Sequence, residues 1–279
     1  MAKKHISYSE FRNWKICPYY RYLTYDKRVN IFEGNIYTAF GKALHEVCEK
    51  TLTRPKKFSG IPQIKSFFKK NFLEELKKLP ELEIEQLKKE NLSNWITSAE
   101  EIIPEVYVAL KKQFGNNFKI QKNVLAAEEI LMEPVGTFNE KSMKFKGFID
   151  LVVADEESNK IHLIDWKTCS WGWNTKKKSN TLIAQQLVFY KYFYCKKHGI
   201  DPSNVETYFA LLKRTAKQGN KVEFVRVTSG KKRIENALNE LNKALHNITL
   251  GNHIKNKLSC TSCSHRPGKC EFYKTEHCT

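Results

Sequence analysis

The sequence predicts an α/β fold in which a mixed central sheet is flanked by helices, with a helical insertion and a cysteine-rich C-terminal cap. Three patterns support this prediction. Residues 145–168 consist of two runs rich in Val, Ile and Phe around a polar turn, which is the pattern of a β-hairpin. Residues 182–197 have the composition of a helix that ends at Gly199. Two strand-like runs and another helical pattern follow before Gly251.

The segment before the hairpin begins with helical patterns. Ser7 and Glu10 have the spacing of a capping box, so a helix is expected to begin there. It is expected to end at Cys17, because a residue before proline disfavours the helical region. A second helix is expected over residues 38–52, where apolar side chains recur at helical spacing. Residues 124–133 fit a helix or a strand, and their place before the hairpin favours a strand.

We expect the chain to form one domain over residues 1–279. The Lys- and Glu-rich segment 55–120 contains two amphipathic helical patterns and is expected to be a helical insertion, with Pro104 inside the second helix. Residues 255–279 hold four of the eight cysteines and are expected to form a metal-binding cap.

The chain is strongly basic. Its 48 Lys and Arg residues exceed its 30 Asp and Glu residues, which gives a formal net charge of +18. This excess predicts a polyanionic partner, with nucleic acid ahead of an anionic membrane surface. The sequence has neither a long apolar run nor an apolar leader after its first methionine, so we expect a soluble, cytoplasmic protein. A phosphate-binding loop of the GxxxxGK[ST] type is also absent, which argues against a built-in ATPase motor.

Two carboxylates and a lysine in the predicted hairpin form the candidate site. Asp165 and Lys167 are two residues apart on one strand and therefore share a face, where Asp150 of the other strand can meet them. Carboxylate oxygens are ligands that Mg²⁺ and Mn²⁺ accept, and a lysine beside the metal suits phosphodiester hydrolysis. The alternative is a solvated surface pair without function.

For each of three further features, the sequence leaves two interpretations open. His45 lies beside the apolar stripe of the second helix, either as a metal ligand or as a packed side chain. Glu128 or Glu129 could approach the metal site, but strand alternation puts them on opposite faces and does not choose between them. Trp171 and Trp173, next to three lysines, could stack on bases or cover the edge of the core.

The C-terminal cysteines are spaced like metal ligands. In a reduced compartment, such a cluster indicates a metal site more than a disulfide framework. One possibility is a local zinc site, closed by Cys278 or His277. The other is an iron–sulfur cluster that three of them share with a distant cysteine. Unligated thiols are the remaining interpretation. The cysteines concerned are Cys260, Cys263, Cys270 and Cys278.

The order of these motifs resembles the RecB-like branch of the PD-(D/E)XK nuclease superfamily, which includes the RecB and AddB nuclease domains and the CRISPR-associated adaptation nucleases. Each motif is weak alone, but six in the same order span the chain from Ser7 to Cys270. The matching stretches are Cys17-Pro18, GKALH, GFID, IDWKT, QLVFY and the CxxC-x6-C tail.

The resemblance implies a restriction-endonuclease-like fold and a role for each site residue. His45, Asp150 and Asp165 would bind the divalent metal, with the Trp166 carbonyl as a further ligand. Lys167 would position or polarise the attacking water. The family often has Glu where this chain has Asp165, and either carboxylate can bind the metal.

The resemblance also assigns two further groups. Gln186 and Tyr190 match the Q-x3-Y helix motif that faces the active site and DNA. In iron–sulfur members of the branch, a 4Fe-4S cluster ties the chain ends together, held by one cysteine near the N-terminus and three near the C-terminus. Cys278 is extra and keeps the zinc alternative open. The matching cysteines are Cys17, Cys260, Cys263 and Cys270.

The expected function is therefore Mg²⁺- or Mn²⁺-dependent hydrolysis of DNA, with exonuclease activity favoured. The setting would be repair, recombination, or phage- or CRISPR-type DNA processing. DNA with single-stranded character is the expected partner, with a helicase or recombination protein as a possible second partner. Two alternatives remain from the sequence: a nucleic-acid-binding module with an inactive nuclease site, and a zinc-stabilised adaptor protein.

Overall fold

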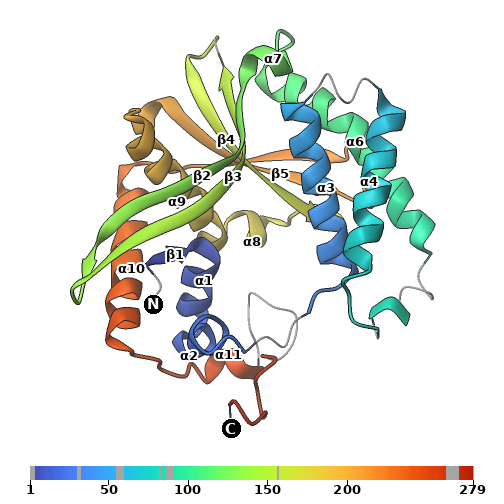
Figure 1. Cartoon of the computed structure of the whole chain (residues 1–279). Helices are drawn as coiled ribbons and strands as arrows, with labels where there is room; N and C mark the ends of the chain where they lie inside the picture. Colours follow the sequence, from blue (N-terminus) through green and yellow to red (C-terminus); the bar gives the residue numbers. More distant parts are fainter. Residues whose placement is uncertain are drawn as a thin grey trace. The chain divides into compact units, whose positions relative to one another are not determined.

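The computed structural model describes residues 4–29, 33–54, 60–81, 83–85, 91–155, 157–261 and 270–278. These residues form a mixed six-stranded sheet with flanking helices (Figure 1), and this confirms the predicted fold class. The strand order is β1-β3-β4-β5-β6, and β2 also pairs with β3. The strands are β1 (His5–Ser7), β2 (Val124–Phe138), β3 (Lys141–Asp155), β4 (Lys160–Cys169), β5 (Val205–Lys213) and β6 (Val222–Val227).

The predicted long helices are present. A π-helical turn (Tyr22–Asp26) follows the second helix. None of the helices in the described ranges is long and apolar enough to cross a membrane. The α-helices are α1 (Tyr8–Ile16), α2 (Pro18–Arg21), α3 (Ile36–Thr53), α4 (Ile61–Leu76), α6 (Leu92–Phe114), α7 (Ile120–Asn123), α8 (Thr175–Lys178), α9 (Thr181–His198), α10 (Lys231–Leu250) and α11 (Leu258–Thr261).

The chain divides into two compact units. The first unit contains β1, α1, α2, α10, α11 and the hairpin formed where β2 turns into β3. The second contains α3, α4, α6, α9 and the strands from the later half of β3 to β6. The first consists of Met1–Phe32, Leu131–Gly147 and Gly230–Thr279, and the second of Glu33–Ile130 and Phe148–Ser229.

The second unit is built around the predicted hairpin. β3 and β4 pair antiparallel, whereas β4 and β5 pair in parallel. A parallel pair needs a crossover connection, and α9 supplies it. Residues 124–133 lie in β2, so the expectation of a strand there is correct.

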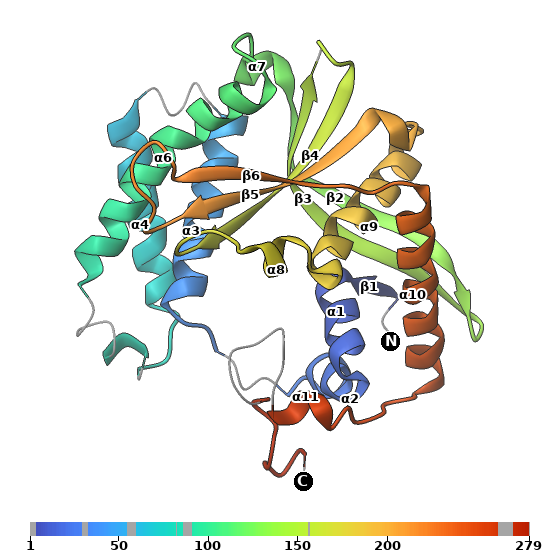
Figure 2. The ribbon, with the colours of Figure 1, turned by 180° about the vertical axis from the view of Figure 1, so that it is seen from behind.

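Helices α3, α4 and α6 pack together on the sheet of the second unit, and α9 lies apart from them (Figures 1 and 2). Their shared core is aromatic. The ring of Phe40 lies 5.7 Å from Phe68, 5.8 Å from Phe72 and 5.4 Å from Trp95, in edge-to-face arrangements. Such pairs add roughly 0.5–1.5 kcal/mol each beyond the area they bury. This packing fixes α3, and with it His45, against the end of β4.

Helix α1 of the first unit has one of the two hydrogen bonds that the predicted capping box would contain. The Ser7 hydroxyl accepts the N–H of Glu10 at 3.2 Å, as expected. The Glu10 side chain does not return to the cap; it accepts from Arg21 Nε at 2.9 Å. A buried guanidinium competes more strongly for a buried carboxylate than one backbone N–H does, because both charges would otherwise be desolvated alone.

We predict that this buried pair is necessary for the stability of the first unit. The Arg21 and Glu10 side chains are only 3% and 1% exposed, so Arg21→Met leaves a buried carboxylate without its guanidinium. The expected loss is about 3–5 kcal/mol in the free energy of unfolding, measured by urea denaturation. Lys15→Ala is the matched control, because the Lys15–Glu240 pair is exposed and should be worth under about 1 kcal/mol. Equal losses would contradict the assignment.

Candidate active site

Two carboxylates lie where strands β3 and β4 part. The antiparallel ladder of these strands runs from the pair Asp155–Lys160 to the pair Leu151–Ile164. Asp150 and Asp165 come directly beyond the last pair. The backbone N–H of Trp166 donates to Asp150 Oδ2 at 2.7 Å, so the carboxylate of β3 is fixed on the backbone of β4.

Lys167 faces the second carboxylate. Its Nζ lies 2.6 Å from Asp165 Oδ2, as the two-residue spacing on one strand predicts. No N–H or O–H in the described ranges makes a geometrically regular hydrogen bond to this Oδ2 atom, so the ammonium is its neighbour as an ion-pair contact. Asp165 is 4% exposed and Lys167 is 32% exposed, so the carboxylate is buried while the lysine reaches solvent.

Helix α9 fixes the other oxygen of Asp165. Gln186 Nε2 donates to Asp165 Oδ1 at 2.7 Å and to the Tyr190 hydroxyl at 3.1 Å. Gln186 and Tyr190 are four residues apart and therefore lie on one face of the helix, and both are buried. They hold the carboxylate in one orientation.

His45 comes to the site from α3. Its Nδ1 lies 3.8 Å from Asp150 Oδ2. Burial lowers the pKa of His45 to about 4, and the Lys167 charge acts in the same direction, whereas Asp165 opposes it. His45 is therefore neutral at pH 7, and a neutral imidazole is the form that can bind a metal.

Burial raises the pKa of both carboxylates, the opposite of its effect on His45. Desolvation raises the pKa of Asp150 and of Asp165 to about 6, although the Lys167 charge lowers both. The Asp150 carboxylate also disfavours the ionised form of Asp165, because its charge raises the pKa of Asp165 further. A nearby cation would stabilise the ionised form of these two desolvated carboxylates.

The donor set fits a hard divalent metal in its chemistry. Two carboxylates and a neutral imidazole are present, and Mn²⁺ and Mg²⁺ accept carboxylates. In their present positions, no three His, Cys, Asp or Glu side chains within the described ranges surround a common point closely enough to hold a metal ion. The Lys167 ammonium is the cation next to Asp165 in this arrangement.

A family model for the PD-(D/E)XK nuclease superfamily matches residues 5–268 of the chain. The chain belongs to the PD-(D/E)XK nuclease superfamily. The match includes all the residues gathered at the candidate active site. A solved structure of a "Putative exonuclease" from Eubacterium rectale is similar over 96% of this chain and 90% of its own, with 14% sequence identity and a TM-score of 0.55. That likeness shows the shared restriction-endonuclease-like fold. No curated protein matches the chain.

The structure chooses between the two glutamates of β2. Glu129 accepts from Lys197 Nζ at 2.7 Å and lies 2.9 Å from His198 Nε2, which places it on the C-terminal end of α9. Glu128 has a left-handed φ of 51° and is close enough to Asp150 for its charge to raise the pKa of that carboxyl. In this superfamily member, Glu128 is thus the carboxylate on the side of the site.

Sequence reasoning missed Glu49. Its charge also raises the pKa of Asp150, and it follows His45 by four residues on α3. That spacing places the two side chains on one helix face, which was the available signal. Glu49 is ion-paired with Lys50 at 2.7 Å.

The tryptophans after β4 have different roles. Trp173 is 8% exposed and packs on Phe209 with 5.0 Å between ring centroids, so it covers the edge of the core. Trp171 is 79% exposed and remains available to a ligand. Lys178 pairs with Glu223 at 2.5 Å.

The chain ends meet within the first unit. The N–H of Asn256 points to Cys17 Sγ at 3.4 Å, and the N–H of Cys270 donates to the carbonyl of Cys260 at 2.8 Å. The pKa of the Cys260 thiol is raised by burial and by the neighbouring Cys278 and Cys17. Cys263 lies outside the described residues.

Proposed function

We propose that this superfamily member is a Mg²⁺- or Mn²⁺-dependent deoxyribonuclease of the RecB-like branch, acting as an exonuclease. The observation that carries the proposal is the convergence of Asp150, Asp165, Lys167 and His45 at the fork of β3 and β4. Each of these side chains comes with the chemistry that phosphodiester hydrolysis needs: acidic oxygens, a neutral nitrogen donor and a fixed positive charge.

The residues that would hold the metal are Asp150, Asp165 and His45, with the carbonyl of Trp166 as a further ligand. A bound Mg²⁺ or Mn²⁺ would supply Lewis-acid stabilisation of the phosphate and lower the pKa of a bound water. Imidazole is a softer donor than the oxygens that Mg²⁺ prefers, so His45 favours Mn²⁺ as the more effective ion.

Lys167 would orient the attacking water and stabilise the charge that develops on the phosphate oxygens. Its Nζ lies 2.6 Å from Asp165 Oδ2, which keeps it beside the carboxylates that would hold the metal. Gln186 and Tyr190 act on the reaction through Asp165, because they fix the orientation of its carboxylate. They are positioning residues in this proposal.

The net charge of +18 supports DNA as the substrate, because Lys and Arg side chains neutralise phosphates and release counterions. Binding should then weaken steeply as salt is added. We propose a strand with single-stranded character as the substrate and a helicase or recombination protein as the partner that generates it.

The test is digestion of single- and double-stranded DNA labelled at either end, with Mg²⁺, Mn²⁺ or a chelator. We expect metal-dependent release of short products from one labelled end, abolished by the chelator and restored by added metal. Release that is unaffected by the chelator would contradict metal dependence. Internal cuts in a closed circular substrate would contradict the exonuclease assignment.

We propose, in addition, that a 4Fe-4S cluster holds the chain ends together. Its ligands would be Cys17, Cys260, Cys263 and Cys270, and its role structural. The contact of Cys17 with Asn256 and the hydrogen bond between Cys270 and Cys260 support this proposal. Thiolates bind both iron–sulfur clusters and zinc, so spectroscopy must separate them.

We predict that the anaerobically purified protein is brown and absorbs near 400 nm, as roughly expected for thiolate-bound iron–sulfur centres. Cys263→Ser should lose this band, whereas Cys278→Ser, the matched control, should keep it. A colourless protein that contains one equivalent of zinc, lost in Cys278→Ser, would favour the local zinc site instead.

A further inference from the structure

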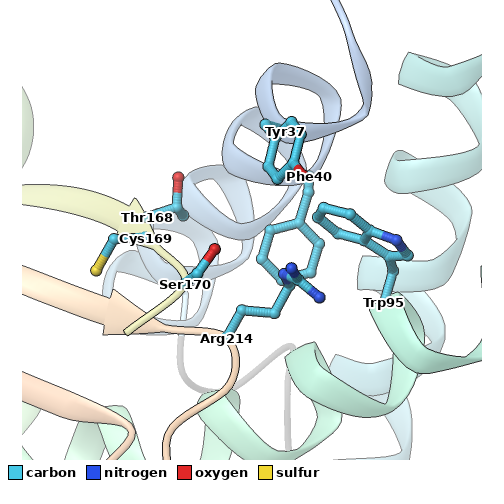
Figure 3. A pocket seen from close by; sticks show the side chains of 7 residues that line it. All are labelled: Tyr37, Phe40, Trp95, Thr168, Cys169, Ser170 and Arg214. Atoms are coloured by element: carbon cyan, nitrogen blue, oxygen red, sulfur yellow. The ribbon is translucent and has the colours of Figure 1, made fainter. Parts of the chain in front are cut away.

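A small pocket lies beside the candidate active site, within the second unit. Its walls come from the start of α3, from α6, from the end of β4 and from the turn after β5 (Figure 3). Three of its side chains are aromatic, two carry aliphatic hydroxyls, one is a cysteine and one is an arginine. The lining residues are Tyr37, Phe40, Trp95, Thr168, Cys169, Ser170 and Arg214.

The pocket is tied to the catalytic residues by two elements. Tyr37 and His45 are eight residues apart on α3, which is about 12 Å along one helix face. On β4, Thr168 directly follows Lys167, so its side chain lies on the opposite face of the strand, towards α3. The two elements approach closely because Gly41 lies between them: a Cβ there would be 3.0 Å from Thr168 Oγ1. A strand bound at His45 that continues along α3 would therefore reach this pocket with a nucleotide about 12 Å away.

The polar groups of the pocket are held ready for an anion. The Arg214 guanidinium lies 4.0 Å from the ring centroid of Trp95, which fixes its plane. Among the described residues, no carboxylate lies within ion-pair distance of Arg214, and no group of these residues makes a hydrogen bond with the hydroxyls of Thr168 and Ser170. Figure 3 shows the Ser170 hydroxyl and the guanidinium on the same side of the pocket.

The backbone keeps these walls in place. The N–H of Arg214 donates to the carbonyl of Cys169 at 2.8 Å, and the N–H of Thr215 to the carbonyl of Ser170 at 2.9 Å. The turn after β5 is thus fixed to the end of β4. A guanidinium held in this way loses little conformational entropy when it binds a phosphate, since its orientation is already set.

Size and exposure decide which part of a nucleotide enters. The cavity volume is about 90 Å³, several times the space that one water needs, which leaves room for a phosphate group. Tyr37 at the rim is 54% exposed, whereas Trp95 is 3% exposed. A base can therefore stack only on Tyr37, outside the cavity.

We infer that this pocket is a nucleotide subsite for single-stranded DNA. Arg214, Thr168 and Ser170 bind the phosphate of a nucleotide near the scissile bond, and its base stacks on Tyr37. A duplex would keep that base paired and away from the tyrosine ring, so the subsite favours a single strand. This inference rests on the proposed function, because it takes DNA as the substrate.

The experiment measures binding of a fluorescent single-stranded oligothymidine and of its duplex, by anisotropy in a chelator so that cleavage is absent. Arg214→Gln keeps a planar group on Trp95 but removes the charge, and should weaken single-strand binding roughly tenfold and reduce the salt slope by about one. Tyr37→Ala should also weaken it roughly tenfold, whereas Tyr37→Phe should bind like the wild type. Duplex binding should change less in each case.

Two matched controls belong to the same unit. Arg226 is 57% exposed and pairs with Glu206, so Arg226→Gln removes the same charge elsewhere. Tyr107→Ala removes a tyrosine that is 37% exposed on α6. If wild-type protein binds and cleaves DNA but the pocket variants bind no more weakly than these controls, the subsite is overturned and the nuclease proposal stands. If wild-type protein neither binds nor cleaves DNA, both are overturned.

Discussion

Lys167→Ala will reduce DNA cleavage by about 10²–10³-fold while leaving DNA affinity within a factor of about two. Removing one group that stabilises developing charge typically costs this much in rate. Binding is spread over many basic side chains on a chain with a net charge of +18, so one lysine contributes little to it. The two quantities are measured by single-turnover digestion with Mn²⁺ and by anisotropy in a chelator.

Lys160→Ala is the matched control for this prediction. Lys160 lies at the other end of the same strand, is 37% exposed against 32% for Lys167, and is ion-paired with Glu206 at 2.6 Å. Lys160 thus resembles Lys167 in exposure and in having one ion pair, but it lies away from the candidate active site. A fall in rate that is equal in the two variants, or a Lys167→Ala variant that cleaves normally, would remove Lys167 from the reaction.

Asp150→Asn will lower cleavage at least about 10³-fold and weaken Mn²⁺ binding by more than about 100-fold, measured by digestion and by calorimetry. Even an outer partner of a metal ligand is commonly worth 10–100-fold in affinity, so a ligand should be worth more. The fold should not suffer, because desolvation raises the pKa of Asp150 to about 6 and a neutral amide avoids that burial of charge.

Asp155→Asn is the control for this second prediction. Asp155 lies at the far end of β3, where it accepts from Glu157 and Ser158 in the hairpin turn, and these hydrogen bonds lower its pKa. Its loss should cost about 1 kcal/mol of stability and no activity. Asp150→Asn protein with wild-type Mn²⁺ affinity would show that the metal binds elsewhere.

The hairpin and the positions of its charged residues could be predicted because they depend on local rules. A period of two along β4 puts Asp165 and Lys167 on one face whatever the rest of the fold does. The ladder between β3 and β4 then sets Asp150 opposite. The four-residue spacing of Gln186 and Tyr190 is equally local, and the structure adds that both act on Asp165.

Other features depend on contacts that no local pattern specifies. The sequence left Glu128 and Glu129 as alternatives, because strand parity assumes regular alternation and Glu128 has a left-handed backbone that breaks it. The capping box at Ser7 was incomplete because Arg21, eleven residues beyond Glu10, takes the carboxylate. Such competition between partners appears only when the chain is folded.

The proposed subsite at Arg214 could not be predicted from the sequence either. Tyr37, Trp95 and Arg214 belong to three separate elements with no shared motif, and their meeting depends on how α3 and α6 pack on the sheet. Gly41 has no Cβ, and this allows the Thr168 side chain to approach α3 closely. A glycine within a helical pattern was a visible signal, but its partner was not.

The central claim is that Asp150, Asp165 and His45 share one divalent ion. It is tested most directly by anomalous diffraction from crystals of the protein soaked in Mn²⁺. We predict one strong anomalous peak within coordination distance of the two carboxylates and the imidazole, with the Lys167 ammonium moved away from Asp165. A catalytically active crystal form whose Mn²⁺ peak lies away from these three side chains would contradict the account.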